Sequence, residues 1–147
     1  MALVVLAVAG CASKLVVLPP ASVAGSITAA AALNPSASQR PSPLLLRVYE
    51  LRGATAFNQA EFMALYQADQ ATLGAELLAR DELTLQPGES RPYARQLHAD
   101  TRFIGVVGVY RDLEHARWRA IVPVQPARAQ KLTIRADSLA VSATVFP

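Results

Sequence analysis

The chain has 147 residues, of which 52% are hydrophobic and 17% are charged, and its formal net charge is +3 at pH 7. That length suits one domain with its own hydrophobic core, and a single cysteine excludes an intrachain disulfide. The basic residues are dispersed along the sequence, whereas nucleic-acid binders gather them into a stripe or block, so the pattern argues against nucleic-acid binding.

The N-terminal segment carries the first specific signal. Residues 1–10 are apolar throughout, too few for a transmembrane helix of about 20 residues, and fit the apolar region of a secretory signal peptide. Small residues lead up to Cys11, which resembles the bacterial lipobox, where the cysteine is acylated and becomes the new N-terminus. We predict that Cys11 is the lipidation site and carries fatty acids such as palmitate; the alternative is an unmodified cysteine in an apolar segment.

The residues around this cysteine predict a destination and a tether. Signals normally open with Lys or Arg and this one has neither, so we expect the true translation start to lie upstream. The residue after the cysteine is Ala12 and not the Asp that keeps such lipoproteins at the inner membrane, so we expect the periplasmic face of the outer membrane. Residues 11–22 contain Pro19 and Pro20, which fit neither a helix interior nor a central strand, and are predicted to form a flexible tether.

The remaining residues, 23–147, are predicted to form one β-rich domain. Residues 23–33 mix helix-favouring alanines with strand-favouring residues and are assigned to a strand. Residues 34–43 contain three prolines and three serines and are predicted to form a loop. Residues 44–52 alternate, with apolar side chains on both faces, as an interior strand requires.

The pattern changes to a helical period over residues 57–79 and then returns to strands. The helical part consists of two segments that are separated near Asp69, which can cap the second. Short strands with turn residues between them follow at 82–85, 91–98, 103–110, 118–124, 131–136 and 139–145. We therefore predict a mostly β fold, an antiparallel β-sandwich with a short helical insertion between early strands.

The sequence offers no catalytic set, cofactor site or metal site. His98 and His115 lack a second His or Cys at ligand spacing, and no serine lies in a Gly-x-Ser-x-Gly pattern. Asp81 and Glu82 would point to opposite faces of a strand and could not act together. We predict that the protein is not an enzyme.

Two other groups of residues have structural interpretations. Gly105 and Gly108 are expected at strand positions that need close packing. The charged residues around Trp118 form either a recognition patch or a charged hairpin end, with the tryptophan covering the rim of the sandwich. They are Arg111, Asp112, Arg117 and Arg119.

Several motifs, taken in order, resemble the type VI secretion lipoprotein family, TssJ. They are the lipobox, Leu33-Asn34-Pro35 with Arg40-Pro41-Ser42-Pro43, Val48-Tyr49-Glu50-Leu51, the helical residues 62–66, the turn at 85–89, and residues 104–113 with Trp118-Arg119. None is specific alone, but their order and spacing cover nearly the whole chain after the signal.

The resemblance implies a transthyretin-like β-sandwich anchored in the outer membrane. It implies that the protein scaffolds the trans-envelope complex by binding the periplasmic C-terminal region of the inner-membrane protein TssM, through the loop that joins the first two strands. The matching partner-binding residues here are Asn34, Pro35, Ser36, Ala37, Ser38, Gln39, Arg40 and Pro41.

Residue chemistry alone leaves alternatives open. The proline-rich loop has little freedom to lose on docking, and Arg40 offers several donors, but an inert hairpin connection has the same composition. A ligand-binding or chaperone-like periplasmic lipoprotein is the alternative function, and an envelope hydrolase is a remote third.

Overall fold

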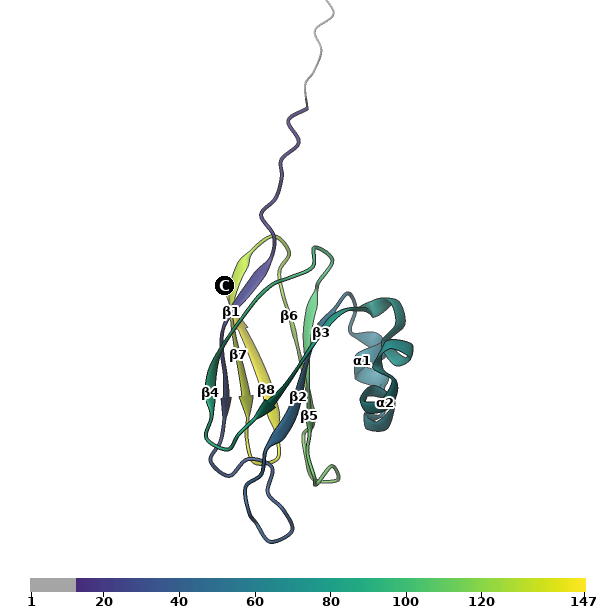
Figure 1. The fold of residues 1–147 in the computed structure, drawn as a ribbon. Coiled ribbons are helices and arrows are strands. Elements are labelled where there is room, and N and C mark those ends of the chain that lie inside the picture. The colour runs from purple at the N-terminus through teal and green to yellow at the C-terminus, as the bar shows by residue number, and fades with distance from the viewer. Residues whose placement is uncertain (1–12) are drawn as a thin grey trace, which may run out of the picture.

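A computed structural model describes residues 13–147, which form two β-sheets packed face to face, with two short helices on the outer face of one sheet (Figure 1). The elements in chain order are β1 Ser22–Ala29, β2 Leu44–Leu51, α1 Thr55–Gln59, α2 Phe62–Leu73, the 3-10 turn Gly74–Glu76, β3 Leu77–Leu85, β4 Ser90–Gln96, β5 Phe103–Val109, β6 Arg119–Pro123, β7 Ala129–Ala136 and β8 Val141–Phe146.

The strand order confirms the predicted sandwich and changes one detail of it. One sheet has the order β4-β1-β7-β8 and the other β3-β2-β5-β6. Neighbouring strands are antiparallel except β1 and β7, which run parallel with Ser22 opposite Ala129. The predicted antiparallel arrangement therefore holds for every neighbouring pair of strands except β1 and β7. The parallel pair joins the two ends of the domain sequence, and no local hairpin pattern encodes such a long-range pairing.

The sandwich interior is filled by apolar side chains from both sheets. Leu44, Leu46 and Val48 of β2 face this interior and are at most 3% exposed. Strands of the other sheet supply Ile27, Leu132 and Ile134, among others, in one continuous cluster. Because these side chains fill the space between the sheets, the interior provides no support for the alternative of a ligand carried there.

The helices explain why the second sheet is apolar on both faces. Tyr49 and Leu51 point away from the sandwich interior and pack with Phe57 and Leu65 beneath α1 and α2. At Gly105, a Cβ would lie 2.9 Å from the ring of Phe57, so the close packing expected at this glycine is confirmed. The helical insertion thus forms a second, smaller core.

The helical region differs in its bounds from the prediction. The helical structure ends at Glu76, and β3 begins at Leu77, within the segment predicted to be helical. A break at Ala60, between α1 and α2, was missed, whereas the predicted interruption near Asp69 is present as non-helical backbone at Ala68. Because β3 is paired with β2 along its length, tertiary pairing overrides the local helical period here.

The first strand is shorter than predicted. It ends at Ala29, and the chain then turns before the loop, instead of continuing to Leu33.

Trp118 lies between the two cores. It is half-buried directly before β6 and packs edge to face on Phe62 of α2, at 5.2 Å between ring centroids. It also packs against the sandwich core.

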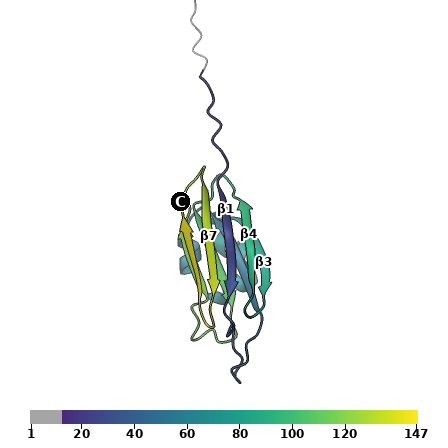
Figure 2. The same cartoon turned by 90° about the vertical axis from the view of Figure 1, so that its left-hand side faces the viewer.

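The chain connections divide the sandwich into two ends. Residues 13–20 extend away from one end, which also carries the β4–β5 and β6–β7 connections and the C-terminus (Figures 1 and 2). The β1–β2, β5–β6 and β7–β8 connections lie at the opposite end. We call these the tether end and the far end. Cys11 and the signal over 1–10 lie outside the described residues, and within 13–147 no helix is long and apolar enough to span a bilayer.

Candidate functional site

The predicted partner-binding loop lies at the far end, and its base is held by Asn34. The backbone N–H of Asn34 donates to Ser138 O at 3.0 Å, and its side-chain Nδ2 donates to Pro43 O at 2.8 Å. Its Oδ1 accepts from the backbone N–H of Arg111 at 2.9 Å, and its carbonyl accepts from the Ser42 hydroxyl. One side chain therefore joins both arms of the loop to the β5–β6 connection.

The tip of the loop is a closed turn with its own hydrogen bonds. Ser36 N–H donates to Arg40 O at 2.8 Å, and Gln39 N–H donates to Ser36 O at 2.9 Å. The Ser36 hydroxyl accepts from the Arg40 N–H at 3.2 Å and pairs with the Ser38 hydroxyl at 3.0 Å. Gln39 has a φ of 62°. These bonds fix the tip in one shape before any partner arrives, which lowers the entropy lost on binding.

The loop and the neighbouring connections enclose a groove of about 580 Å³. Its lining residues come from the β1–β2, β5–β6 and β7–β8 connections, which are far apart in the sequence. They are Pro35, Ser36, Ala37, Gln39, Arg111, Asp112 and Leu139. The lining combines apolar residues with the polar Ser36 and Gln39 and the charged Arg111 and Asp112.

The predicted partner-binding residues do not share one role. Asn34 is 2% exposed and its side-chain atoms are used inside the protein, so it positions the loop. Pro35 and Ser36 are half-buried, whereas residues 37–41 are exposed to solvent. A partner approaching the far end would meet residues 37–41 and the groove beside them.

The structure separates the other candidate residues. His98 precedes β5 and His115 follows it, so the two histidines lie at opposite ends of the sandwich. Among residues 13–147, no three His, Cys, Asp or Glu side chains are placed to hold a metal ion. Asp81 accepts from Arg95 on one face of β3, while Glu82 accepts from Arg47 on the other, which confirms their divergence.

The charged residues near Trp118 also divide. Arg111 and Asp112 line the far-end groove. Arg119 stacks over the Trp118 ring at 4.7 Å and donates to Phe57 O at 3.0 Å and Ala60 O at 2.8 Å. Arg119 therefore caps carbonyl groups at the end of α1, while Arg111, Asp112 and the exposed Arg117 remain able to contribute to recognition.

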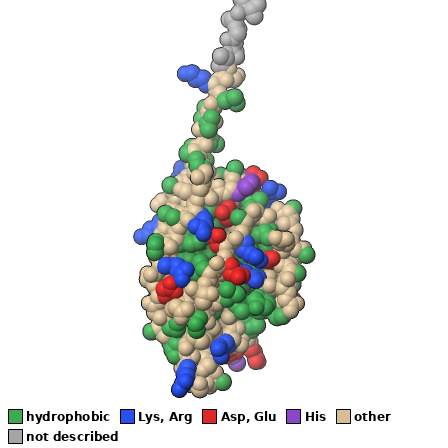
Figure 3. All heavy atoms as spheres, in the orientation of Figure 1, with side chains coloured by type: hydrophobic (Ala, Val, Ile, Leu, Met, Phe, Trp, Pro, Cys, Tyr) green, Lys and Arg blue, Asp and Glu red, His purple; other side chains and the backbone are tan. Residues whose placement is uncertain are grey.

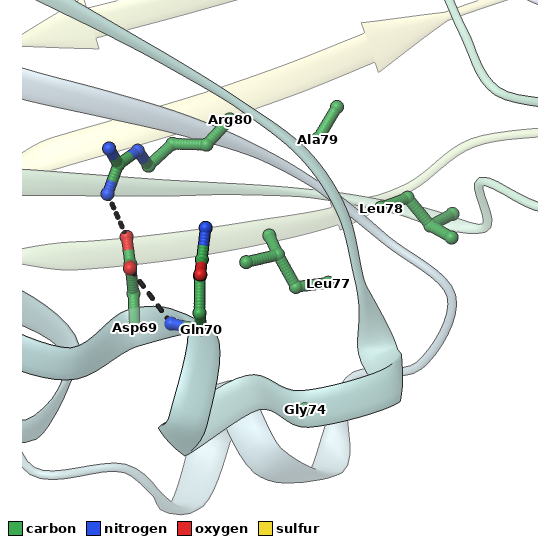
Figure 4. A pocket seen from close by; sticks show the side chains of 7 residues that line it. All are labelled: Asp69, Gln70, Gly74, Leu77, Leu78, Ala79 and Arg80. Carbon is green, nitrogen blue, oxygen red and sulfur yellow. Dashed lines mark hydrogen bonds and ion pairs between the residues drawn. The ribbon is translucent and has the colours of Figure 1, made fainter.

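Sequence reasoning missed a buried charge cluster centred on Asp69, which is 6% exposed (Figure 4). Its carboxylate pairs with Arg80 of β3, lies 3.7 Å from Arg47 of β2, and accepts from the Tyr49 hydroxyl at 3.2 Å. Burial opposes ionisation, but the hydrogen bond and charge of Arg80 outweigh it and lower the pKa of Asp69; burial also raises the pKa of Tyr49.

This cluster clamps the helices onto the second sheet. Arg47 also donates to Leu65 O at 3.1 Å and Tyr66 O at 3.0 Å, which close the helix before the irregular backbone at Ala68. A hollow of about 470 Å³ beside the cluster is lined by β3 and the end of α2. The charge of the Asp69 carboxylate is balanced by Arg80 and Arg47, and none of the residues that line the hollow is a Ser, Cys, Thr or Lys nucleophile. The sequence did contain a signal for this cluster, because Arg47 is a charged residue among Leu45, Tyr49 and Leu51 on one face of the predicted strand.

The chain matches a protein family over residues 21–139, and that family is described as type VI secretion lipoprotein, VasD, EvfM, TssJ. The match spans most of the chain. This protein belongs to the type VI secretion lipoprotein family. The resemblance drawn from its motifs is therefore confirmed, and as a member of this family it is a lipoprotein of the type VI secretion system and not an enzyme.

Solved structures agree with this membership. The T6SS lipoprotein TssJ1 from Pseudomonas aeruginosa is 42% identical, with a TM-score of 0.84 over 88% of this chain and 98% of that one. Serratia marcescens Lip, a membrane-bound component of the type VI secretion system, is 25% identical, with a TM-score of 0.77 over 84% and 96%. No curated protein matches the chain.

A third similar chain comes from a structure of the T6SS protein TssM C-terminal domain from EAEC. It is 25% identical to this type VI secretion lipoprotein, with a TM-score of 0.68 over 83% of this chain and 99% of that one. The fold described above thus recurs in structures from this secretion system.

Proposed function

We propose that this type VI secretion lipoprotein is anchored through a lipid on Cys11 to the periplasmic face of the outer membrane. There it scaffolds the trans-envelope complex by binding the periplasmic C-terminal region of TssM through its β1–β2 loop. Residues 37–41 of the loop are the contact surface, while Asn34 and Ser42 set its shape. The family membership and the similar chain in a TssM structure support this partner.

The observation that carries the proposal is the position of the loop relative to the tether. The tether leaves one end of the sandwich and the loop protrudes from the other (Figure 1). A strand of eight residues spans about 26 Å, so the loop is held at least that far from the membrane end of the domain. It therefore points toward a protein that crosses the periplasm from the inner membrane.

The loop is tested by copurification from solubilised envelopes. Replacing residues 36–41 with a short Gly/Ser turn removes the exposed tip but keeps the buried Asn34 and Ser42. We expect loss of TssM from the purified complex, with the lipoprotein still in the membrane fraction. The single substitution Arg40→Ala removes the charged donors of the tip, and we expect about tenfold weaker binding, because one charge-assisted contact contributes about 1.5 kcal/mol.

Arg128→Ala is the matched control, because Arg128 is also exposed but lies in the β6–β7 connection at the tether end. It is expected to leave TssM binding unchanged. Retention of TssM by the tip replacement would show that the loop assignment is wrong. If the Arg128→Ala variant also failed to copurify TssM, loss of a positive charge at either end would have the same effect. The binding could then not be assigned to the loop.

The anchor is tested by labelling cells with radioactive palmitate. We expect incorporation into the native chain and none into Cys11→Ser, because Cys11 is the single cysteine of the sequence. Two or three acyl chains are needed for a durable anchor, since one gives only reversible membrane binding. Separation of the inner and outer membranes by density then locates the labelled protein, and its recovery with the inner membrane would contradict the predicted sorting.

A further inference from the structure

The tether contains an exposed apolar run that the domain does not use. Leu15, Val16, Val17 and Leu18 are 93%, 79%, 90% and 67% exposed, and they form no secondary structure. Figure 3 shows apolar side chains along the tether where it leaves the domain. Solvated linkers are built from Gly, Ser, Pro and charged residues, and four consecutive large apolar side chains in water are unfavourable.

The domain surface next to this run also exposes apolar side chains. Leu18 and Pro19 line a groove of about 580 Å³ with Pro126 and Arg102. Phe146 is 50% exposed at the end of β8. It lies opposite Lys131, and Lys131 lies opposite Ala24, two residues from the start of β1. An exposed aromatic ring therefore lies at the tether end, on β8, with β7 between it and β1.

Positive charge surrounds the same end. Lys14 directly precedes the apolar run, and Arg102 and Arg128 are exposed in the two connections at the tether end. Arg52 is also there and pairs with Asp100 at 3.0 Å. Apolar side chains bordered by basic residues are the pattern of segments that lie in the interface of a membrane with anionic lipids.

We propose that residues 15–18 insert into the membrane interface and extend the lipid anchor into the polypeptide. The inference rests on the proposed lipidation, because the run begins four residues after Cys11 and is thereby held against the bilayer. The membrane covers the four apolar side chains, while Lys14, Arg102 and Arg128 meet lipid phosphates.

Insertion changes the geometry of the whole protein. A free tether over residues 12–21 would reach roughly 35 Å from the anchor at about 3.5 Å per residue. With residues 15–18 in the interface, only residues 19–21 separate the membrane from β1, and two of them are prolines. The sandwich is then held within about 10 Å of the bilayer, and the far-end loop stays at a nearly constant height.

The test uses the purified lipidated chain in vesicles of phosphatidylethanolamine with a minority of phosphatidylglycerol. Because the thiol of Cys11 is acylated, Val16→Cys supplies the one free thiol for an environment-sensitive fluorophore. We expect its emission to shift to shorter wavelength in vesicles and to be quenched by nitroxide on the lipid acyl chains. A fluorophore on Ala37→Cys in the far-end loop is expected to show neither effect.

The deciding variant carries Leu15→Ser, Val17→Ser and Leu18→Ser together with the labelled residue 16. These changes lie outside the folded domain and leave the acyl anchor in place. We expect loss of both the shift and the quenching. Equal quenching in this variant would mean that the anchor alone imposes proximity, and absence of quenching in the parent would mean that the run stays in water; either result overturns the proposal.

Two further results are distinguishable. The fluorophore on residue 16 could also emit at short wavelength without vesicles and remain unquenched by nitroxide lipids when vesicles are added. That result would show that the run packs on protein, and it would also overturn the proposal. Reaction of the fluorophore with the native chain, which has only Cys11, would show that this thiol is free. That outcome removes the proposed anchor together with the inference, whereas the other outcomes leave the anchor standing.

Discussion

At the scale of single residues, Asn34 decides the shape of the loop on which the proposed function depends. Its φ of 44° is a left-handed conformation that asparagine tolerates better than most residues. Its amide donates to one arm of the loop and accepts from the backbone of Arg111, which is 77 residues away in the sequence. The residue thereby joins a local turn to a long-range contact.

We expect Asn34→Ala to lower the free energy of unfolding by about 2 kcal/mol, since two buried hydrogen bonds are lost and the left-handed backbone becomes strained. Asn34→Gly loses the same hydrogen bonds without the backbone strain and should be intermediate. Chemical denaturation measures both variants. An unchanged midpoint in both would contradict the positioning role of this side chain.

The second prediction at this scale concerns acid. The pKa of Asp69 is lowered in the folded protein, against the effect of burial, by Arg80. Its ionised form therefore stabilises the fold above about pH 4, and this contribution disappears as the pH falls through the lowered folded pKa. Asp69→Asn should cost about 2 kcal/mol at pH 7, because two arginines then lack their buried partner, and should show a shallower loss of stability below pH 4.

The matched control for this prediction is Asp137→Asn. Asp137 pairs with Arg135 at 2.7 Å, but its side chain is 42% exposed and the pair is solvated. Exposed pairs contribute little to stability, so this variant should follow the native acid profile. Denaturation midpoints measured from pH 7 to pH 3 compare the two. An acid profile of Asp69→Asn equal to that of the native chain would show that folding does not lower the pKa of Asp69.

At the scale of the elements, the central strand β1 is the point where the first sheet is most constrained. It pairs with β4 on one side and with β7 on the other. At Gly25 a Cβ would lie 1.8 Å from the carbonyl oxygen of Leu132, its partner in the parallel ladder. No side-chain movement relieves a contact with backbone, so the strand needs glycine here.

Gly25→Ala is therefore expected to destabilise the domain by on the order of 3 kcal/mol or more, through separation of β1 from β7. The neighbouring Ser26→Ala is the matched control, because Ser26 already carries a Cβ and is only half-buried. Circular dichroism and denaturant midpoints report both. A Gly25→Ala protein with native stability would show that β1 and β7 are farther apart than described.

At the scale of the whole molecule, the two ends of the sandwich are expected to act independently. The tether leaves one end and the far end carries the loop (Figure 1), with a packed core between them. Sites separated by this distance without shared partners contribute additively. The membrane and partner functions should therefore be separable by mutation.

We expect a double dissociation. Cys11→Ser should abolish membrane fractionation and secretion while the chain still folds and binds the TssM region in solution. Replacement of residues 36–41 should abolish TssM binding while the protein stays in the membrane with an unchanged melting temperature. Membrane flotation, a pull-down and thermal unfolding measure the three properties. Loss of TssM affinity in Cys11→Ser in solution would contradict the independence of the two ends.

Local patterns in the sequence determined much of this protein. The two-sided apolar alternation over residues 44–52 predicted an interior strand, and the prolines and serines of residues 34–43 predicted a loop. These features depend on backbone preferences and side-chain periods that act within a few residues, so they can be predicted from the sequence. The family also followed from motif order, and it was confirmed by the match over residues 21–139.

Only the tertiary structure decided the features that join distant segments. The parallel pair of β1 and β7, the clamp of Asp69 on Arg80 and Arg47, and the bond from Asn34 to the β5–β6 connection each link residues that no local period relates. Residues 77–79, which local periodicity predicted to be helical, form part of strand β3 because they pair with β2. These contacts form because burial and charge are satisfied across the fold, and they place the loop at the end opposite the tether.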